Sequence, residues 1–421
     1  MSKKIKIAIL GAGISGLSIA KLLKDSFEVE IFERSENPGG IARSKIIDEL
    51  SYHVTGGHCF NSIYPEVMDF VFNDILPITE WNKIERKAEV ILGDLTVPYP
   101  IEYAIKHIFK YNAPLAQDIL FDYFSTKDQM EITNLLEFFE QHFGKVLTEL
   151  YFKPYNEKIW KKNLEDVSFE WAKDKLPIPD KASVLRSLFE EESDQMPHRF
   201  FYYPKSNSQN IFIDRLADGL KINFNYNITK IAYNDFSEKW IINDKLQFDL
   251  IISTLPLNEL PSLITDTPQK IIECANQLRY NKLTTTFWET QSTKSTWTYV
   301  PDRNKLAHRY IHIGNFFNPN KNVTITEAIG RYTLEEIVQS EANNPFFIKP
   351  LAHHVSNHAY VVFDKNHESA TREIFDYLNY IGLYSLGRFG EWQYYNMDVC
   401  IKKSIDLSKI IIDMYDHSNR D

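Results

Sequence analysis

Three glycines near the start of the chain have the spacing of a phosphate-binding turn. Gly11, Gly13 and Gly16 lie in the sequence GAGISG, between an apolar run and a segment with helical periodicity. Glycines at these positions let the backbone turn tightly and approach a pyrophosphate at the start of a helix. Glu33 ends the next apolar run, where a carboxylate binds ribose hydroxyls in such sites. The pattern predicts a dinucleotide cofactor.

A second glycine turn, NPGGIARS, follows this acidic residue. Gly39 and Gly40 allow another close approach of the backbone to a ligand, and Arg43 places a cation beside it. An NAD site does not need this second turn, whereas FAD has a flavin to seat further along. The segment YHVTGGHCF adds Gly57 and His58 as a turn predicted to face the flavin. The cofactor is therefore predicted to be FAD.

Polar aromatic residues and arginines mark a second kind of chemistry. The segment LGRFGEWQYYNMDV, residues 386–399, carries Arg388 and Tyr394 between two apolar stretches. It is too rich in polar aromatic residues for a core strand, which indicates ligand recognition. Arg309 lies in the apolar run AHRYIHIGNF, where an unpaired charge is costly. This arginine is therefore expected to have a functional partner.

The elements that must position these residues can be read from the hydrophobic pattern. KIKIAIL predicts a buried parallel strand, LSIAKLLKD a helix and FEVEIFER a second strand, which together form a β-α-β unit. From about residue 100 to 191 the pattern is mostly helical. Its last part, KLPIPDKASVLRSLFEEESDQMPH, is rich in proline and charge and is predicted to be a mobile loop. Short strand-like runs follow, and a terminal helix closes the chain.

Composition narrows the class of protein. The 421 residues, 43% of them apolar, are enough for a large core. The net charge of -10 argues against nucleic acid as the main partner. Cys59, Cys274 and Cys400 have no paired spacing and are expected to be reduced thiols in a cytoplasmic protein. No apolar run approaches the roughly 18 residues of a membrane span, and no signal peptide or metal site is predicted.

Taken together, these motifs resemble UDP-galactopyranose mutase, and its eukaryotic form more than the bacterial one. Further blocks that carry the resemblance are VPYPIE at 97–102, YFKPYNEKIW at 151–160, FEWAKDKLPIP at 169–179 and FDLIISTLP at 248–256. TWTYVP precedes AHRYIHIGNF, and the C-terminal segment has the family's G-R-x-G-x-W-x-Y order. The blocks are short, but their order and spacing cover most of the chain.

The pattern and the resemblance together predict an α/β fold. It consists of a Rossmann-like FAD-binding domain completed by N- and C-terminal segments, an inserted helical subdomain, and an antiparallel β-sheet substrate domain. The expected ranges are 1–95 for the first FAD-binding part, 96–197 for the helical insertion with its mobile loop, 198–260 for return strands of the FAD domain, 261–370 for the substrate sheet, and 371–421 for the second FAD-binding part.

The resemblance also implies a reaction, the interconversion of UDP-galactopyranose and UDP-galactofuranose. The N5 atom of reduced FAD attacks the anomeric carbon, and the protein holds UDP and stabilises the charge on the leaving diphosphate. Arg309 is expected to clamp phosphate with its planar fork. Tyr360 and Tyr394 are each expected to donate one hydrogen bond. A uridine pocket is expected from Tyr99, Tyr155, Asn156 and Trp160, with Trp297 and Tyr299 on the sugar side.

The implied site therefore has three sets of residues. The catalytic set is Arg309, Lys175, His58, Tyr360 and Tyr394. The set that binds FAD is Gly11, Gly13, Ile14, Ser15, Gly16, Glu33, Arg34, Gly39, Gly40, Ile41, Ala42, Arg43, Gly57, His58, Arg388, Asn396, Met397 and Asp398. The set that binds substrate is Tyr99, Glu102, Tyr155, Asn156, Trp160, Lys175, Trp297, Tyr299, Arg309, Tyr360 and Tyr394.

Three positions depart from the family pattern. Lys175, in the predicted lid over residues 175–195, stands where the family has arginine, so it keeps the charge and loses the fork. Glu102 stands where the eukaryotic form tends to have glutamine, so a carboxylate faces the ligand. Asn396 stands where the bacterial form has aspartate, which leaves the site less negative. A related nucleotide sugar, such as an N-acetylated or deoxy hexose, remains open as the substrate.

Two other functions fit the FAD motifs. One is an oxidase or desaturase of the amine-oxidase type, such as a relative of protoporphyrinogen oxidase, which needs an apolar substrate tunnel. The other is a flavin-binding module without catalysis. The mutase interpretation implies a UDP-sugar substrate, an external reductant (NAD(P)H or a reductase) that primes the flavin, and a possible homo-oligomer. It implies neither nucleic acid nor a membrane span.

Overall fold

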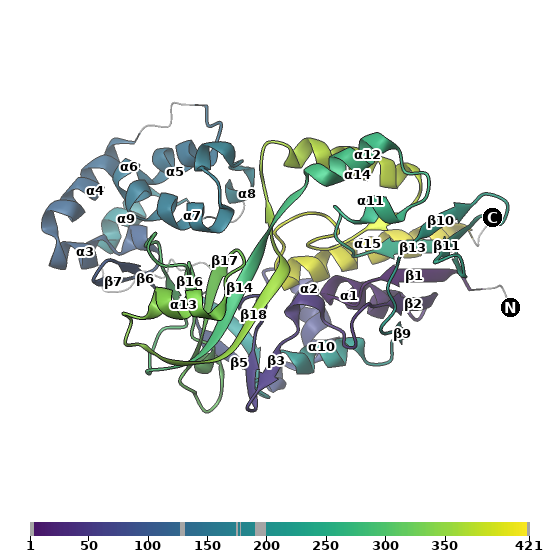
Figure 1. Ribbon diagram of the computed structural model, residues 1–421, viewed down its shortest axis with the longest axis horizontal. Coiled ribbons are helices and arrows are strands. Elements are labelled where there is room, and N and C mark those ends of the chain that lie inside the picture. The colour runs from purple at the N-terminus through teal and green to yellow at the C-terminus, as the bar shows by residue number, and fades with distance from the viewer. Residues whose placement is uncertain (1–3, 127–130, 174–175, 177, 190–198, 419–421) are drawn as a thin grey trace.

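A computed structural model describes residues 4–126, 131–173, 176, 178–189 and 199–418, with the backbone alone for 416–418. Figure 1 shows three regions along the long axis of the molecule. A parallel sheet with its helices lies at one end, a group of helices lies at the other, and long twisted strands connect them. Among the described residues, no helix is both long enough and apolar enough to cross a membrane.

The parallel sheet has the order β19-β13-β1-β2-β9. Ile7 of β1 pairs with Leu250 of β13, so strands more than 240 residues apart are direct neighbours. The sheet is completed by distant segments, as predicted. Its strands are β1 (Lys6–Leu10), β2 (Glu28–Phe32), β9 (Ile222–Asn223), β13 (Leu250–Ser253) and β19 (Tyr384–Ser385).

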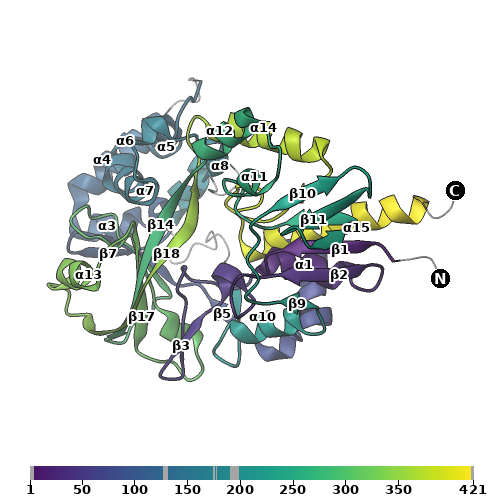
Figure 2. The ribbon, with the colours of Figure 1, turned by 45° about the vertical axis from the view of Figure 1, so that its right-hand side comes forward.

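Two helices from opposite ends of the sequence pack beside this sheet. They are α1 (Ile14–Leu23) and α15 (Met397–Ser418), and they lie next to each other in Figures 1 and 2. The hydroxyl of Ser404 donates to the backbone oxygen of Ser15 at 3.2 Å. Leu17 and Ile401 are both fully buried in the same apolar cluster. The start of the C-terminal helix is therefore held beside the start of α1.

The central sheet has seven strands in the order β18-β14-β17-β16-β15-β6-β7. All neighbours are antiparallel except β15 and β6, which are parallel. The predicted antiparallel sheet is thus mixed, because β6 comes from an earlier part of the chain and no hairpin dictates its direction. The strands are β6 (Ala88–Leu92), β7 (Leu95–Pro98), β14 (Arg279–Thr290), β15 (Trp297–Tyr299), β16 (Arg309–Ile311), β17 (Val323–Ile329) and β18 (Phe347–Val362).

The helical region follows β7 and has clear local signals. Side chains of Asn112, Asn134 and Asp180 each accept a backbone N–H bond at a helix start. Helix α5 buries Leu135, Phe138, Phe139 and Phe143 on one face. The helices are α3 (Ile105–Tyr111), α4 (Ala113–Ser125), α5 (Leu135–Phe143), α6 (Lys145–Leu147), α7 (Lys153–Trp160), α8 (Glu170–Lys173) and α9 (Lys181–Ser187), with the short turns η4 (Ile101–Tyr103), η5 (Thr148–Phe152) and η6 (Leu164–Asp166).

Smaller elements fill the connections between these regions. The remaining strands are β3 (Lys45–Ile47), β4 (Leu50–Tyr52), β5 (Trp81–Glu85), β8 (Phe200–Pro204), β10 (Ile231–Asn234), β11 (Lys239–Ile242) and β12 (Leu246–Phe248). The remaining helices are α2 (Pro65–Asp69), α10 (Asn210–Ala217), α11 (Leu260–Leu263), α12 (Gln269–Gln277), α13 (Leu334–Glu341) and α14 (His367–Tyr380), with η1 (Gly40–Ala42), η2 (Phe70–Ile75), η3 (Ile78–Glu80) and η7 (Ile313–Phe316).

The five domain ranges expected from the sequence remain a prediction. The structure adds one observation on their first boundary. Strand β6, at residues 88–92, pairs with β15 in the central sheet and not with the parallel sheet. Its Val90 is fully buried in the apolar cluster that joins the central sheet to the helical region. The chain therefore enters the central sheet several residues before the expected end of the first FAD-binding part.

Candidate active site

The first glycine turn requires glycine at two of its three positions. Gly11 has a φ of +103°, and a Cβ there would lie 2.4 Å from Oγ1 of Thr254. A Cβ on Gly16 would lie 2.0 Å from the carbonyl oxygen of Gly11, so the helix could not pack against the turn. A Cβ on Gly13 would meet no atom within 4 Å. The space beside Gly13 is where the motif predicts the pyrophosphate.

The second turn lies directly against the first. The backbone N–H of Gly39 donates to the oxygen of Ala12 at 2.7 Å. A Cβ on Gly40 would come within 3.3 Å of the Cα of Gly13. Ile14 and Ser15 are the first residues of α1, and η1 holds Ile41 and Ala42. The two turns form one cradle of backbone groups, and side chains at most of its glycine positions would crowd the protein atoms that build it, while the position of Gly13 faces open space.

Polar side chains around the cradle have defined partners. Glu33 is buried and accepts backbone N–H bonds from Ala12 and Ser35, both at 2.8 Å. Arg34 is exposed. Arg43 donates to Oδ1 of Asp214 at 2.7 Å. Glu33 therefore holds the glycine turn, while Arg43 is paired with a carboxylate at the edge of the predicted cofactor site.

The turn between β4 and α2 carries two histidines that point into the protein. His58 donates its backbone N–H to Nδ1 of His53 at 2.9 Å, and Nε2 of His53 lies 2.8 Å from the hydroxyl of Tyr203. Because Nδ1 of His53 accepts, its proton is on Nε2. Burial and the nearby Arg388 lower the pKa of His58 to about 4. His58 is therefore neutral near pH 7, and its Nε2 is buried without a hydrogen-bond partner among the described residues.

Arg388, from the C-terminal segment, packs against the stacked phenol rings of Tyr360 and Tyr394. The ring centres of Tyr360 and Tyr394 are 5.5 Å apart and nearly parallel. The guanidinium carbon of Arg388 lies 4.5 Å from the ring centre of Tyr394 and 5.4 Å from that of Tyr360. One nitrogen of Arg388 donates to the oxygen of Ala359 at 2.6 Å, while its Nε is buried with no partner in the described part of the chain.

Arg309 joins this group from the central sheet. Its Nη2 donates to the hydroxyl of Tyr360 at 3.2 Å, and its Nε donates to Oε2 of Glu327 at 2.7 Å. Burial acts to lower the pKa of Arg309, but the charge of Glu327 and the neighbouring phenols more than offset this and raise it. Burial and Arg309 lower the pKa of His308, so the approach of its Nε2 to Glu327 at 3.6 Å is not an ion pair near pH 7.

Glu327 is a site residue that the sequence reasoning missed. It lies on β17, is fully buried, and its Oε1 has no partner among the residues described. A Cβ on Gly56 would come within 2.7 Å of that oxygen, which places the GGH turn against the carboxylate. The signal was available: an acidic residue in the buried strand VTITEAI indicates a charge partner for the same reason that Arg309 did.

An aromatic group extends from Arg309 toward the helical region. The ring of Tyr299 lies 4.7 Å from that of Tyr99 and 5.5 Å from that of Tyr155. Tyr155 also lies 6.0 Å from the ring of His308. Glu102 is buried near these phenols, and burial raises its pKa to about 7. The structure thus brings these four predicted substrate residues together, and Tyr299 pairs with Arg309 across β15 and β16.

The other predicted substrate residues lie elsewhere. Trp160 packs against Trp171 and Phe363, and its Nε1 donates to Oδ1 of Asn156 at 3.3 Å. Both residues are thus part of the packing of the helical region. Trp297 packs against two phenylalanines, and the guanidinium of Arg86 lies 4.3 Å from its ring centre. Their ligand roles remain predictions.

The last predicted residues surround the start of α15. This helix begins at Met397, with Asp398 buried in its first turn and Asn396 exposed just before it. Gly387 has a φ of +93°, and a Cβ there would lie 2.3 Å from Oγ of Ser15, so this segment lies on the first glycine turn. Lys175 and most of the second half of the predicted lid lie outside the described residues.

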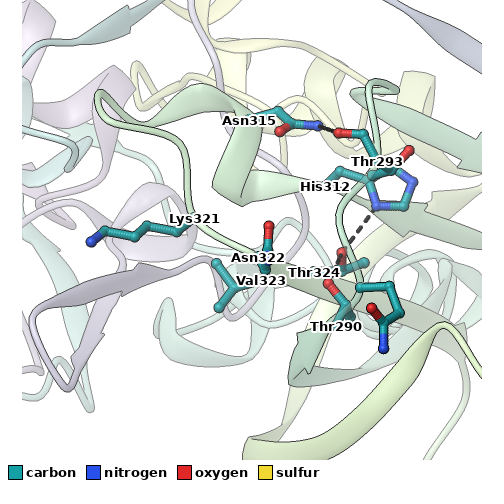
Figure 3. Close-up of a pocket in the computed structure, with 9 residues that line it drawn as sticks. Thr290, Thr293, His312, Asn315, Lys321, Asn322, Val323 and Thr324 are labelled. Atoms are coloured by element: carbon teal, nitrogen blue, oxygen red, sulfur yellow. Dashed lines mark hydrogen bonds between the residues drawn. The ribbon is translucent and has the colours of Figure 1, made fainter.

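Figure 3 shows a small polar pocket that is separate from this group of residues. It is lined by Thr290, His312, Asn315 and Thr324 among others, and none of the predicted site residues takes part. His312 accepts or donates through both ring nitrogens to Thr298 and Thr324. The pocket has a volume of about 10 Å³, which has room for about one water molecule. The pocket is too small for a cofactor or a nucleotide.

The residues present fit FAD. The glycine cradle provides a pyrophosphate seat that side chains would fill, and α1 begins there. Two buried polar atoms without partners in the described structure, Nε2 of His58 and Nε of Arg388, belong to the turns predicted to face the flavin. Residues 9–73 match the family model of NAD(P)-binding Rossmann-like domains, which covers the two glycine turns and Glu33.

Solved structures share the fold over nearly the whole chain. A reduced UDP-galactopyranose mutase has 20% sequence identity and a TM-score of 0.85, over 98% of this chain and 94% of that one. A protein provisionally named protoporphyrinogen oxidase, from Exiguobacterium sp. 255-15, has 16% identity and a TM-score of 0.73, over 98% and 99%. A fatty acid isomerase from P. acnes that produces CLA has 17% identity and a TM-score of 0.66, over 97% and 99%.

These comparisons confirm the predicted fold. The chain has an α/β architecture with a Rossmann-like domain, and its resemblance to the mutase extends over almost all of its length. Proteins with different stated activities have the same architecture. The reaction must therefore be argued from the residues at the site.

Proposed function

We propose that the protein is a FAD-dependent mutase that interconverts UDP-galactopyranose and UDP-galactofuranose, or a closely related pair of nucleotide sugars. The observation that carries this proposal is the partly buried Arg309, which lies beside Tyr360 and near the stacked Tyr394 and Arg388. Two cations and two phenols in one partly buried group suit a diphosphate. They do not suit the apolar tunnel that an oxidase of hydrophobic substrates requires.

The protein's residues would divide the work between two neighbouring sites. The glycine cradle and Glu33 would hold FAD, which when reduced supplies the nucleophile for the anomeric carbon. Arg309 would bind the diphosphate and stabilise the charge that develops as UDP leaves. Tyr360 and Tyr394 would donate hydrogen bonds to the same oxygens. Tyr99 and Tyr155 would provide an aromatic wall for the nucleoside, with Tyr299 beside them on the sugar side.

Glu327 would tune the strength of this clamp. Its Oε2 contacts both Nε of Arg309, at 2.7 Å, and Nη2, at 2.5 Å, while Nη2 also donates to the hydroxyl of Tyr360 at 3.2 Å, so the guanidinium is held at a fixed angle. The carboxylate also compensates a charge that would otherwise be buried alone. A diphosphate would therefore meet a fixed guanidinium in a desolvated setting, where its attraction for anions is larger than in water.

The test separates a mutase from an oxidase by redox balance. The enzyme is reduced under anaerobic conditions with a stoichiometric amount of dithionite and then mixed with excess UDP-galactopyranose, while product and flavin absorbance are followed. Substrate and product are isomers, so many turnovers are expected while the flavin stays reduced. Reoxidation of one flavin per product, or activity that needs oxidised flavin and oxygen, would instead support an oxidase.

The remaining expectations belong to the same proposal. A reductant such as NAD(P)H or a separate reductase would be needed only to prime the flavin. The three cysteines are free thiols, which agrees with a reducing, cytoplasmic location. A homo-oligomer remains possible under this proposal. Titration with UDP, UDP-galactose and UDP-N-acetylgalactosamine would show which sugar the site accepts.

A further inference from the structure

A buried lysine connects the helical region to the central sheet. Lys158, on α7, is 9% exposed. Its Nζ donates to three backbone oxygens: Val300 at 2.8 Å, Asp302 at 2.8 Å and Ala307 at 2.6 Å. All three acceptors lie in the turn that joins β15 to β16. This lysine therefore reaches across the sequence into a single loop and binds only its backbone.

The contacts require the charged form of the side chain. An ammonium group has three N–H donors, one for each of these oxygens, whereas a neutral amine has two and would lose one of the three bonds. Burial lowers the pKa of Lys158 to about 7, while Asp302 and Glu341 act to raise it. The carbonyl oxygens also favour the ammonium. A buried ammonium group whose hydrogen bonds all go to main-chain oxygens has one favoured position, at the centre of its acceptors.

The loop that Lys158 holds carries two residues of the proposed site on its ends. Val300 directly follows Tyr299, and Ala307 lies two positions before Arg309. On α7, Tyr155 precedes Lys158 by three residues, so both side chains lie on the same side of the helix. Tyr155 in turn contacts the rings of Tyr299 and His308. The lysine thus lies where α7 meets the β15–β16 turn.

We propose that Lys158 is a positioning residue that fixes the β15–β16 hairpin, with Tyr299 and Arg309, against the helix that carries Tyr155. This inference rests on the proposed function, because it assumes that these three side chains bind the nucleotide sugar. It goes beyond that function in assigning their alignment to one buried ammonium group that touches neither cofactor nor substrate.

The hairpin does not depend on Lys158 to form. Val300 donates its N–H to the oxygen of His308 at 2.8 Å, and β15 and β16 pair with each other and with β6 and β17. The strands should therefore persist when the lysine is removed. The orientation of the hairpin turn relative to α7 should then vary. Arg309 and Tyr155 would no longer meet a ligand in one fixed arrangement.

The chain provides a matched control in the same pair of elements. Arg303, in the same turn, donates to Oε2 of Glu157, the residue before Lys158, at 2.7 Å. The side chain of Arg303 is 59% exposed, so this ion pair is screened by water and should contribute little. Removal of either cation breaks a link between the turn and α7, but only removal of Lys158 loses three hydrogen bonds to backbone oxygens.

The experiment compares Lys158→Met and Arg303→Ala with the wild type. Three quantities are measured on the FAD-loaded proteins: flavin content, UDP affinity by calorimetry, and hydrogen exchange of amides 300–308 without nucleotide. For Lys158→Met we expect normal flavin content, faster exchange in the turn, and UDP affinity lower by roughly tenfold or more. Arg303→Ala should match the wild type in all three. Lys158→Arg, which keeps the charge and several donors, should restore part of the affinity.

The outcomes separate this inference from the proposed function. A folded Lys158→Met protein with wild-type UDP affinity would overturn the inference, as would an equal effect of Arg303→Ala. If Lys158→Met does not fold, Lys158→Gln, with two N–H donors, takes its place, and unchanged affinity in that variant has the same meaning. A wild-type protein that binds no UDP would overturn the proposed function, while the exchange measurement still tests the link, since it needs no nucleotide.

Discussion

The cofactor cradle and the arginine–tyrosine group use opposite means to build a site. The cradle is made of backbone, and glycines between residues 11 and 40 create it by having no side chains. The second group is made of side chains from β16, β17, β18, α7 and the C-terminal segment, each fixed by a partner from another element. The backbone site depends on the absence of side chains at a few neighbouring positions. The side-chain site depends on contacts between elements that are far apart in the chain.

Two alanine substitutions in the first turn should have the largest effect and should separate packing from cofactor binding. A Cβ on Gly16 would collide with the oxygen of Gly11, so Gly16→Ala should lose FAD and also destabilise the protein without FAD. A Cβ on Gly13 meets no protein atom, so Gly13→Ala should lower FAD affinity and leave the apoprotein stable. Thermal unfolding with and without FAD measures both. Equal behaviour of the two variants would contradict the distinction.

Arg309→Ala tests the side-chain group without touching the cradle. Turnover should fall by on the order of 100-fold or more, as when one charge that stabilises a transition state is lost. Flavin content should stay normal, because Arg309 lies outside the glycine turns. Steady-state kinetics of the reduced enzyme with UDP-galactopyranose measures the change in turnover. A folded variant that keeps FAD and near-normal turnover would remove Arg309 from the mechanism.

Glu102→Gln should change how stability depends on pH. Burial raises the pKa of Glu102 to about 7 in the folded state, from the ordinary value of 4.5 for an exposed glutamate. The unfolded chain then releases its proton first, so this residue stabilises the fold fully below about pH 4.5 and loses that contribution as pH rises toward 7. The change in unfolding free energy across this window should be about 3 kcal/mol. Glutamine does not titrate, so the Glu102→Gln variant should lack this pH dependence.

The measurement for Glu102 is urea unfolding at several pH values between 4 and 8, for both proteins. The wild-type curve should fall relative to that of Glu102→Gln across this range. Parallel curves would mean that Glu102 ionises as an exposed carboxylate does, and that the phenols around it are better solvated than the structure indicates.

Asp214→Asn should have the smallest effect. Its ion pair with Arg43 is partly exposed, with Asp214 at 55%, so stability should change by less than about 1 kcal/mol. The variant also frees Arg43, at the edge of the cradle. FAD affinity that rises in Asp214→Asn would support the predicted role of Arg43 in cofactor binding. If FAD affinity is unchanged in both Asp214→Asn and Arg43→Ala, Arg43 has no role in cofactor binding and serves only the ion pair with Asp214.

The two regions also differ in how far the sequence alone could predict them. The cradle was predictable because its glycines have a fixed spacing and a local steric cause, and the fold comparison agrees with the Rossmann-like domain that they indicated. Arg309 was identifiable because a charge in an apolar strand needs a partner. Its partner Glu327 could not be paired with it in advance, since the register of β16 against β17 is set by tertiary packing.

Packing also decided which aromatic residues share a surface. Tyr155 and Trp160 lie on the same helix and were expected in the same pocket. Tyr155 contacts Tyr299, whereas Trp160 turns toward Trp171 and Phe363. The helical periodicity of the segment does not tell which face meets the sheet, because both faces carry aromatic side chains.

The sequence by itself determined the dinucleotide turn, the order of strands and helices at both ends, and the presence of cations that need partners. These are local properties, set by sterics at glycine and by the cost of burying charge. Only the tertiary structure decided that β6 runs parallel to β15, that Glu327 pairs with Arg309, and that Lys158 binds the turn beside both site strands. Each of these depends on contacts between segments far apart in the chain, which no local pattern of residue types specifies.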